Sequence, residues 1–144
     1  MAHLTTFANI PIKVVCGAQP DGLAITKTLL HEIHALLKTL LETGQKGTLD
    51  LRALPALGED GYQFLKEQLG LGEISARLQS FGRSEIQETA YSGIWWVTHY
   101  NQDDAILTEI IEVDFLPEIL KSPKEDAVLS QTRLEKLLNG FTQK

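Results

Sequence analysis

Apolar residues recur at helical spacing in the first half of the chain. Over residues 23–41 they are three or four residues apart, which places them along one face of a helix. Gly44 follows and is suited to end that helix. A second helix is predicted over residues 60–69, with Tyr62, Leu65 and Leu69 on one side. Each helix therefore has a face that must be buried against another layer.

Strand-like stretches replace the helical spacing after Gly70. Their alternation and their β-branched and aromatic residues are typical of strands. They cover residues 74–79, 85–89, 94–100 and 106–113, with turns at Ser92-Gly93 and at residues 101–104. Two earlier stretches are less regular: residues 12–16 read as a short strand, and residues 48–54 as a strand or an extended arm. Strands that follow one another in this way favour an antiparallel meander.

The last helix has a recognisable start. Ser122 is suited to be its N-cap, Pro123 its first residue, and Glu125 completes a capping box. Gly140 is expected to end it, and its apolar side consists of Leu129, Leu134, Leu137 and Leu138. The order of elements predicts an α+β fold, an antiparallel β-meander sheet packed with about three helices, in a single domain over residues 1–144.

Composition and charge narrow the class of protein. Apolar residues make up 43% of the 144 residues, charged residues make up 22%, and the formal net charge is −6. An acidic chain without clustered Lys and Arg is not expected to bind nucleic acid. The single cysteine, Cys16, cannot form an intrachain disulfide, so a reducing cytoplasm is the expected location. The N-terminal residues lack a basic opening and a long apolar run, so neither a signal peptide nor membrane insertion is expected.

Two histidines, His31 and His34, lie three residues apart in the first predicted helix. With Cys16 or Glu32 they could ligate a metal ion, but the motifs HExxH and CxxC are absent. Partly exposed histidines and a small buried cysteine are the commoner explanation. No metal site and no cofactor is therefore predicted. A metal- or cluster-handling factor that uses the histidines and Cys16 is the alternative.

Trp95 and Trp96 are adjacent in a predicted strand, so their side chains point to opposite faces of the sheet. Either helices bury both rings, or one ring stays exposed beside carboxylates and binds a partner. The sequence leaves both alternatives open. Glu85 and Glu88, three residues apart in a strand, also point to opposite faces, so they do not predict a catalytic carboxylate pair.

Several short runs are specific in their order and spacing. They are residues 69–76 (LGLGEISA), 85–89 (EIQET) and 93–97 (GIWWV), flanked by residues 31–33 (HEI), 50–55 (DLRALP) and 111–113 (IEV). Together they span most of residues 23–130. In these runs the chain resembles the HupH/HyaF-type hydrogenase expression/formation proteins, in their C-terminal type of domain. Members of that family are often longer, with additional sequence ahead of the shared part.

The resemblance implies an accessory protein or chaperone, not an enzyme, that assists maturation of an uptake nickel–iron hydrogenase. Its expected partners are the hydrogenase small-subunit precursor, an iron–sulfur subunit exported by the twin-arginine route, and other hydrogenase accessory proteins. We expect the partner-binding surface to include Glu73, Glu85, Glu88, Trp95, Trp96 and His99. Exposed strand edges also permit a homodimer.

Overall fold

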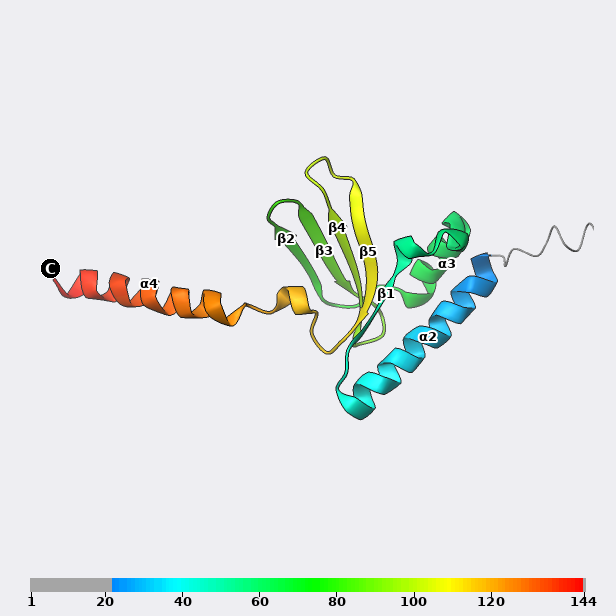
Figure 1. Ribbon diagram of the computed structural model, residues 1–144, viewed down its shortest axis with the longest axis horizontal. Coiled ribbons are helices and arrows are strands. Elements are labelled where there is room, and N and C mark those ends of the chain that lie inside the picture. The colour runs from blue at the N-terminus through cyan, green and yellow to red at the C-terminus, as the bar shows by residue number, and fades with distance from the viewer. Residues whose placement is uncertain (1–21, 144) are drawn as a thin grey trace, which may run out of the picture.

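The computed structural model describes residues 22–143 (Figure 1). The helices are α2 (Gly22–Thr43), α3 (Gly58–Leu69) and α4 (Lys124–Thr142). The strands are β1 (Gly47–Asp50), β2 (Ser75–Gln79), β3 (Arg83–Glu88), β4 (Ile94–Tyr100) and β5 (Ile106–Val113), and the short 3-10 helices are η1 (Leu51–Ala53), η2 (Pro55–Leu57) and η3 (Glu118–Leu120). The predicted α+β class is confirmed. The short strand predicted over residues 12–16, and Cys16 with it, lies outside the described residues.

The strands form one antiparallel sheet in the order β1-β5-β4-β3-β2. Strands β2 to β5 are consecutive hairpins, which is the predicted meander. β1 lies beside β5 at the far edge, with Leu49 opposite Ile111. Of the stretch predicted over residues 48–54 as a strand or an arm, residues 48–50 are therefore strand and residues 51–53 form η1. The strand ends where the Asp50 side chain accepts a hydrogen bond from the Arg52 amide at 2.9 Å and caps η1.

Helices α2 and α3 both lie on one face of this sheet and bury the main core (Figure 1). Their apolar sides meet the side chains of β4 and β5 that point to the same face. The buried members are Leu29, Ile33, Leu40, Leu51, Leu57, Leu65, Leu69, Ile94, Trp96, Ile111 and Val113. Each large apolar side chain removed from water contributes roughly 1.5–3 kcal/mol, so this layer supplies most of the driving force for folding.

The two helices make a close backbone contact at Gly22 and Gly61. A Cβ on Gly61 would lie 2.8 Å from the carbonyl oxygen of Gly22, so any larger residue forces the helices apart. The Thr26 hydroxyl donates to the carbonyl oxygen of Gly61 at 3.0 Å and to that of Gly22 at 2.7 Å. This contact fixes the position of α3 over the sheet.

The opposite face of the sheet carries a smaller apolar cluster. Ile86, Trp95 and Val97 are buried there, with Leu120 of η3 packed against them. The chain after β5 returns over this face, and Nε1 of Trp95 donates to the carbonyl oxygen of Asp114 at 3.0 Å. Trp95 is 2% exposed and Trp96 is 7% exposed. Of the two alternatives for these residues, the structure has both rings buried, so the exposed-tryptophan surface does not form.

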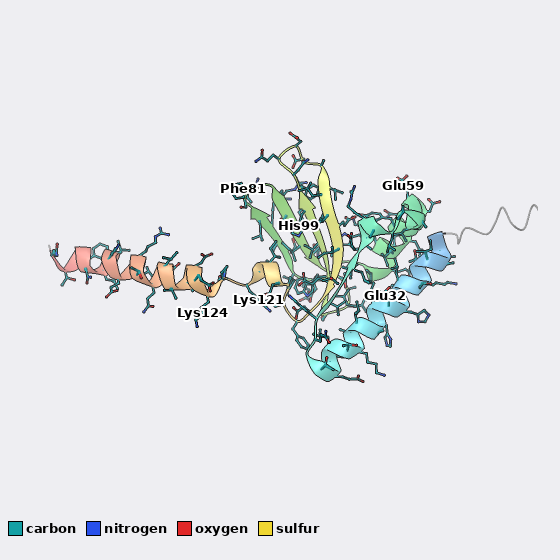
Figure 2. All side chains as sticks on the ribbon, viewed as in Figure 1. Glu32, Glu59, Phe81, His99, Lys121 and Lys124 are labelled. Carbon is teal, nitrogen blue, oxygen red and sulfur yellow. The ribbon has the colours of Figure 1, made fainter. Side chains whose placement is uncertain are left out.

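Helix α4 extends away from the sheet, and none of its described residues is buried (Figures 1 and 2). Two details of the prediction are wrong. Pro123 occupies the N-cap position and no side-chain hydrogen bond caps the helix, because Ser122 lies one residue too early. Gly140 does not end the helix, which continues to Thr142, because this glycine keeps right-handed backbone angles. The sheet is thus packed by α2 and α3, while α4 stands apart.

Across residues 22–143, no helix is long and apolar enough to cross a bilayer.

Candidate binding cavity

A cavity of about 360 Å³ lies between α3 and the sheet face that it covers. Its wall on the helix side is formed by Tyr62, Lys66 and the following Gly70 and Leu71. The sheet contributes the rest of the lining: Glu85, Gln87, Trp96, Thr98, Tyr100, Ile106 and Glu109. Aromatic rings with a few convergent polar groups are the usual composition of a binding site.

Glu109 of β5 is the polar centre of the cavity. Its Oε2 accepts three hydrogen bonds: from the Tyr62 hydroxyl at 2.8 Å, from Nε1 of Trp96 at 3.0 Å and from the Thr98 hydroxyl at 3.2 Å. The residue is only 6% exposed. Within residues 22–143 its Oε1 has no hydrogen-bond or ion-pair partner, and this oxygen is not sealed from solvent. Glu109 therefore presents one free carboxylate oxygen to the cavity.

Tyr62 joins this carboxylate to the helix above it. Burial, together with the hydrogen bond to Glu109 and the charge of that carboxylate, raises the pKa of Tyr62 above its ordinary value. The hydroxyl thus stays protonated and keeps donating at neutral pH. The Tyr62 and Trp96 rings meet edge to face, with centroids 5.4 Å apart and planes at 88°. The two rings form a rigid wall whose polar atoms all point at Glu109.

Lys66 places its ammonium group against this aromatic wall. Its Nζ lies 5.4 Å from the centre of the Trp96 ring and 5.5 Å from that of Tyr62. At this range a cation is attracted by the negative face of an aromatic ring. Since the Lys66 side chain is exposed, it can also turn out toward solvent. The wall formed by Tyr62 and Trp96 is therefore already in contact with one positively charged group.

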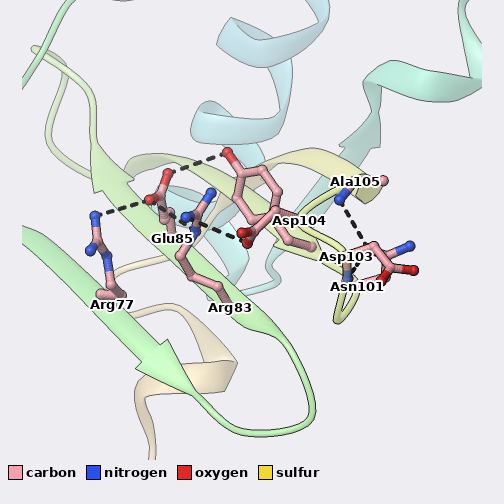
Figure 3. Close-up of polar contacts among 8 residues, drawn as sticks. Arg77, Arg83, Glu85, Asn101, Asp103, Asp104 and Ala105 are labelled. Atoms are coloured by element: carbon pink, nitrogen blue, oxygen red, sulfur yellow. Dashed lines mark hydrogen bonds and ion pairs between the residues drawn. The ribbon is translucent and has the colours of Figure 1, made fainter.

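Glu85 of β3 lies at the other side of the cavity in a network of its own (Figure 3). Its Oε1 lies 3.2 Å from Nη2 of Arg77 and 3.3 Å from Nε of Arg83, and its Oε2 accepts from the Tyr100 hydroxyl at 3.3 Å. Arg83 stacks over the Tyr100 ring at 4.1 Å and lies 3.6 Å from Asp104. The charge of Glu85 is thus matched by ion pairs, whereas Glu109 forms none with the described residues.

The six residues expected at a partner surface do not lie on one surface. Glu85 and Trp96 line the cavity. Trp95 is buried on the other face, and Nδ1 of His99 lies 2.8 Å from the Ser84 hydroxyl on that same face. Glu88 pairs across the strands with Trp95, and Glu73 is exposed just before β2. The structure therefore brings together two of the six expected residues.

Sequence reasoning missed Glu109, the residue around which the cavity is built. A signal was present, because Glu109 has the same parity as Ile111 and Val113, which point into the core. An acidic residue at an inward position of a strand needs buried donors. Tyr62 could not be assigned to it, because Tyr62 is 47 positions away in the sequence and on a different element.

Metal ligands do not gather in the described part of the chain. Residues 22–143 contain no group of three or more His, Cys, Asp or Glu side chains that could hold a metal ion. His31 and His34 are both exposed on α2. Cys16 and His3 lie outside the described residues, so the metal-handling alternative gains no support from this region.

An antiparallel meander with two helices on one face defines an α+β domain. Residues 23–141 match the family described as HupH hydrogenase expression protein, C-terminal conserved region. The chain belongs to this family, which confirms the resemblance read from the sequence.

Individual relatives agree with this assignment. The chain is 31% identical to hydrogenase expression/formation protein HoxQ of Azotobacter vinelandii over 84% of its own length and 43% of that protein. It is 32% identical to HupH of Rhodobacter capsulatus over 84% of its length and 43% of the relative. It is 29% identical to the hydrogenase-1 operon protein HyaF of Escherichia coli over 85% of its length and 42% of that protein. The chain thus spans less than half the length of these relatives.

A solved structure has the same fold over nearly its whole length. The hydrogenase expression protein HupH from Thiobacillus denitrificans superposes with a TM-score of 0.78 at 40% identity, covering 81% of this chain and 97% of that one.

Proposed function

We propose that this protein is an accessory factor in the maturation of an uptake nickel–iron hydrogenase. In this role it binds the precursor of the small, iron–sulfur subunit in the cytoplasm before twin-arginine export. Its contribution is to hold a segment of the precursor, without making or breaking a covalent bond. The membership in the HupH family and the names of the relatives as hydrogenase expression/formation proteins support the hydrogenase part of this proposal.

The single observation that carries the binding role is the cavity beneath α3. It offers two aromatic walls, a buried carboxylate with one free oxygen, and an apolar rim made by Leu71 and Ile106. Leu71 is 74% exposed, so the apolar surface continues outward from the cavity. Such a site, with apolar walls and one oriented polar group, can take the side chains of an extended polypeptide. It is less suited to bind a flat protein surface.

Co-purification tests this function directly. The tagged protein is produced together with the hydrogenase small-subunit precursor, made either with or without its signal segment. We expect recovery of the complete precursor and a large loss of recovery when the signal segment is removed. Equal recovery of both forms would move the contact to the iron–sulfur part of the subunit, and recovery of neither would reject the proposed client.

Two neighbouring residues of β5 supply matched variants for this experiment. Ile106 lines the cavity, whereas Leu107 is exposed and lies outside it. Ile106→Lys is expected to reduce recovery of the precursor, because it interrupts the apolar rim and places a positive charge beside Glu109. Leu107→Lys adds the same charge to the same strand and is expected to leave recovery unchanged.

A further inference from the structure

We propose that the cavity beneath α3 takes a cationic side chain, that of an arginine or a lysine, with Oε1 of Glu109 as its acceptor. The source of that side chain rests on the proposed function, because the segment would belong to the hydrogenase precursor. The recognition itself is a property of the cavity and can be measured without the precursor.

The charge of Glu109 is the first argument. Its three hydrogen-bond donors, from Tyr62, Trp96 and Thr98, are all neutral and all reach Oε2. Among the ion pairs formed within residues 22–143, none involves Glu109. A carboxylate that is 6% exposed and takes part in none of these ion pairs favours a partner that brings a countercharge. A guanidinium or ammonium group at Oε1 would supply that countercharge and a hydrogen bond together.

The aromatic wall is the second argument, and it is independent of the carboxylate. Lys66 rests its ammonium 5.4 Å from the Trp96 ring and 5.5 Å from the Tyr62 ring. The chain's own cation thus occupies the edge of the site, which indicates that a cation is favoured there. An incoming basic side chain would displace Lys66 toward solvent. Lys66 therefore acts as a competitor of the ligand.

Glu85, the other acidic residue that lines the cavity, is not available to accept a basic side chain. Glu85 is held by Arg77, Arg83 and the Tyr100 hydroxyl, so its charge is matched. Leu71 and Ile106 form an apolar rim, so we expect apolar residues on either side of the bound basic residue. The fitting ligand is a basic side chain flanked by apolar residues in an extended segment.

Short peptides test whether the cavity prefers a cationic side chain. The protein is titrated with acetyl-Leu-Arg-Leu-amide, with the same peptide carrying citrulline, and with the same peptide carrying glutamate. Citrulline has the shape of arginine without its charge. Binding is followed by calorimetry and by the intrinsic tryptophan fluorescence, to which Trp96 of the cavity wall contributes together with Trp95. We expect the arginine peptide to bind about tenfold more tightly than the citrulline peptide, as a charge-assisted hydrogen bond predicts. Equal affinities, or a preference for glutamate, would overturn the inference.

Three variants locate the effect. Glu109→Gln keeps a carbonyl oxygen for the neutral donors and removes the charge, so it should abolish the preference for arginine over citrulline. Lys66→Met should tighten arginine binding by several fold, because the competing ammonium is gone. Glu59→Gln removes an exposed charge of α3 outside the cavity and should change nothing. If Glu109→Gln does not fold, the Lys66→Met variant and the citrulline comparison on the unchanged protein still decide the question.

The peptide result and the precursor result are separable. Discrimination between the peptides without recovery of the precursor would keep the cationic site and reject the proposed client. Recovery of the precursor without discrimination between the peptides would keep the client and reject the cationic site.

Discussion

Nε1 of Trp96 on β4 donates to Oε2 of Glu109 on β5 at 3.0 Å, although the residue directly opposite Trp96 is Ile111. The indole ring therefore takes part in both the main core and the cavity. Its apolar surface is part of the main core, and its N–H group helps to hold the carboxylate at the centre of the cavity. The stability of the domain and the geometry of the site are coupled through this one contact.

Removal of the buried Glu109 carboxylate should cost more stability than removal of an exposed carboxylate. Glu109→Ala leaves the Tyr62, Trp96 and Thr98 donors without their shared acceptor. We expect a loss of about 3–5 kcal/mol in the free energy of unfolding, measured in urea. Glu73→Ala, at an exposed position, should cost less than about 0.5 kcal/mol. Similar losses for both variants would contradict the buried hydrogen-bond centre.

The stability of the protein should fall at alkaline pH through Tyr62. The pKa of Tyr62 is raised above its ordinary value of 10.0, mainly by burial. The unfolded chain therefore loses this proton at lower pH than the folded protein does. The contribution of the group is complete below about pH 10 and is lost as the pH rises further.

Tyr62→Phe should cost about 1 kcal/mol at neutral pH, the value of one hydrogen bond, and should make the alkaline fall shallower. Urea unfolding between about pH 8 and pH 11 measures both effects. Tyr91→Phe, at a residue that is 55% exposed, is the control and should keep the steeper fall. A Tyr62→Phe curve parallel to that of the unchanged protein would contradict the assignment.

Gly61→Ala should destabilise the domain although alanine is the better helix former. Its Cβ would meet the carbonyl oxygen of Gly22 at 2.8 Å, so α2 and α3 must separate at a cost of about 1–3 kcal/mol. Gly140→Ala in α4 is the matched control, because nothing lies within 4 Å of its added Cβ. That variant should be neutral or should stabilise α4 by up to about 1 kcal/mol. Thermal unfolding distinguishes the two, and an unchanged melting temperature for Gly61→Ala would refute the close contact.

Helix α4 offers a test of the homodimer that the sequence permits. Leu134, Leu137, Leu138 and Phe141 are 55–68% exposed and recur at helical spacing along one side. We therefore expect self-association through α4, seen by sedimentation and abolished by Leu134→Glu. Since α4 buries nothing against the body, this variant should leave the melting temperature of the domain unchanged. A dimer that persists in Leu134→Glu would place the interface elsewhere.

The sequence predicted the sheet well because its signals are local. The two-residue period of β4 correctly assigned Trp96 and Trp95 to opposite faces, and the turn residues marked the hairpins. The cavity could not be predicted in the same way, because it forms where Tyr62 of α3 meets Glu109 of β5. The apolar side of α4 showed that this helix needs a partner surface. It did not show that α4 packs against no other element in the described part of this chain.

The affinity of the purified small-subunit precursor is compared between the unchanged protein and Glu109→Gln. This comparison tests most directly whether the Glu109 cavity binds the precursor. Glu59→Gln, at an exposed position outside the cavity, serves as the control, and circular dichroism confirms that both variants are folded. A cavity that holds a cationic side chain of the precursor predicts an affinity lower by about tenfold or more for Glu109→Gln, with Glu59→Gln unchanged. Equal affinity of all three proteins would contradict the account, because the precursor would then bind without the carboxylate on which the site is built.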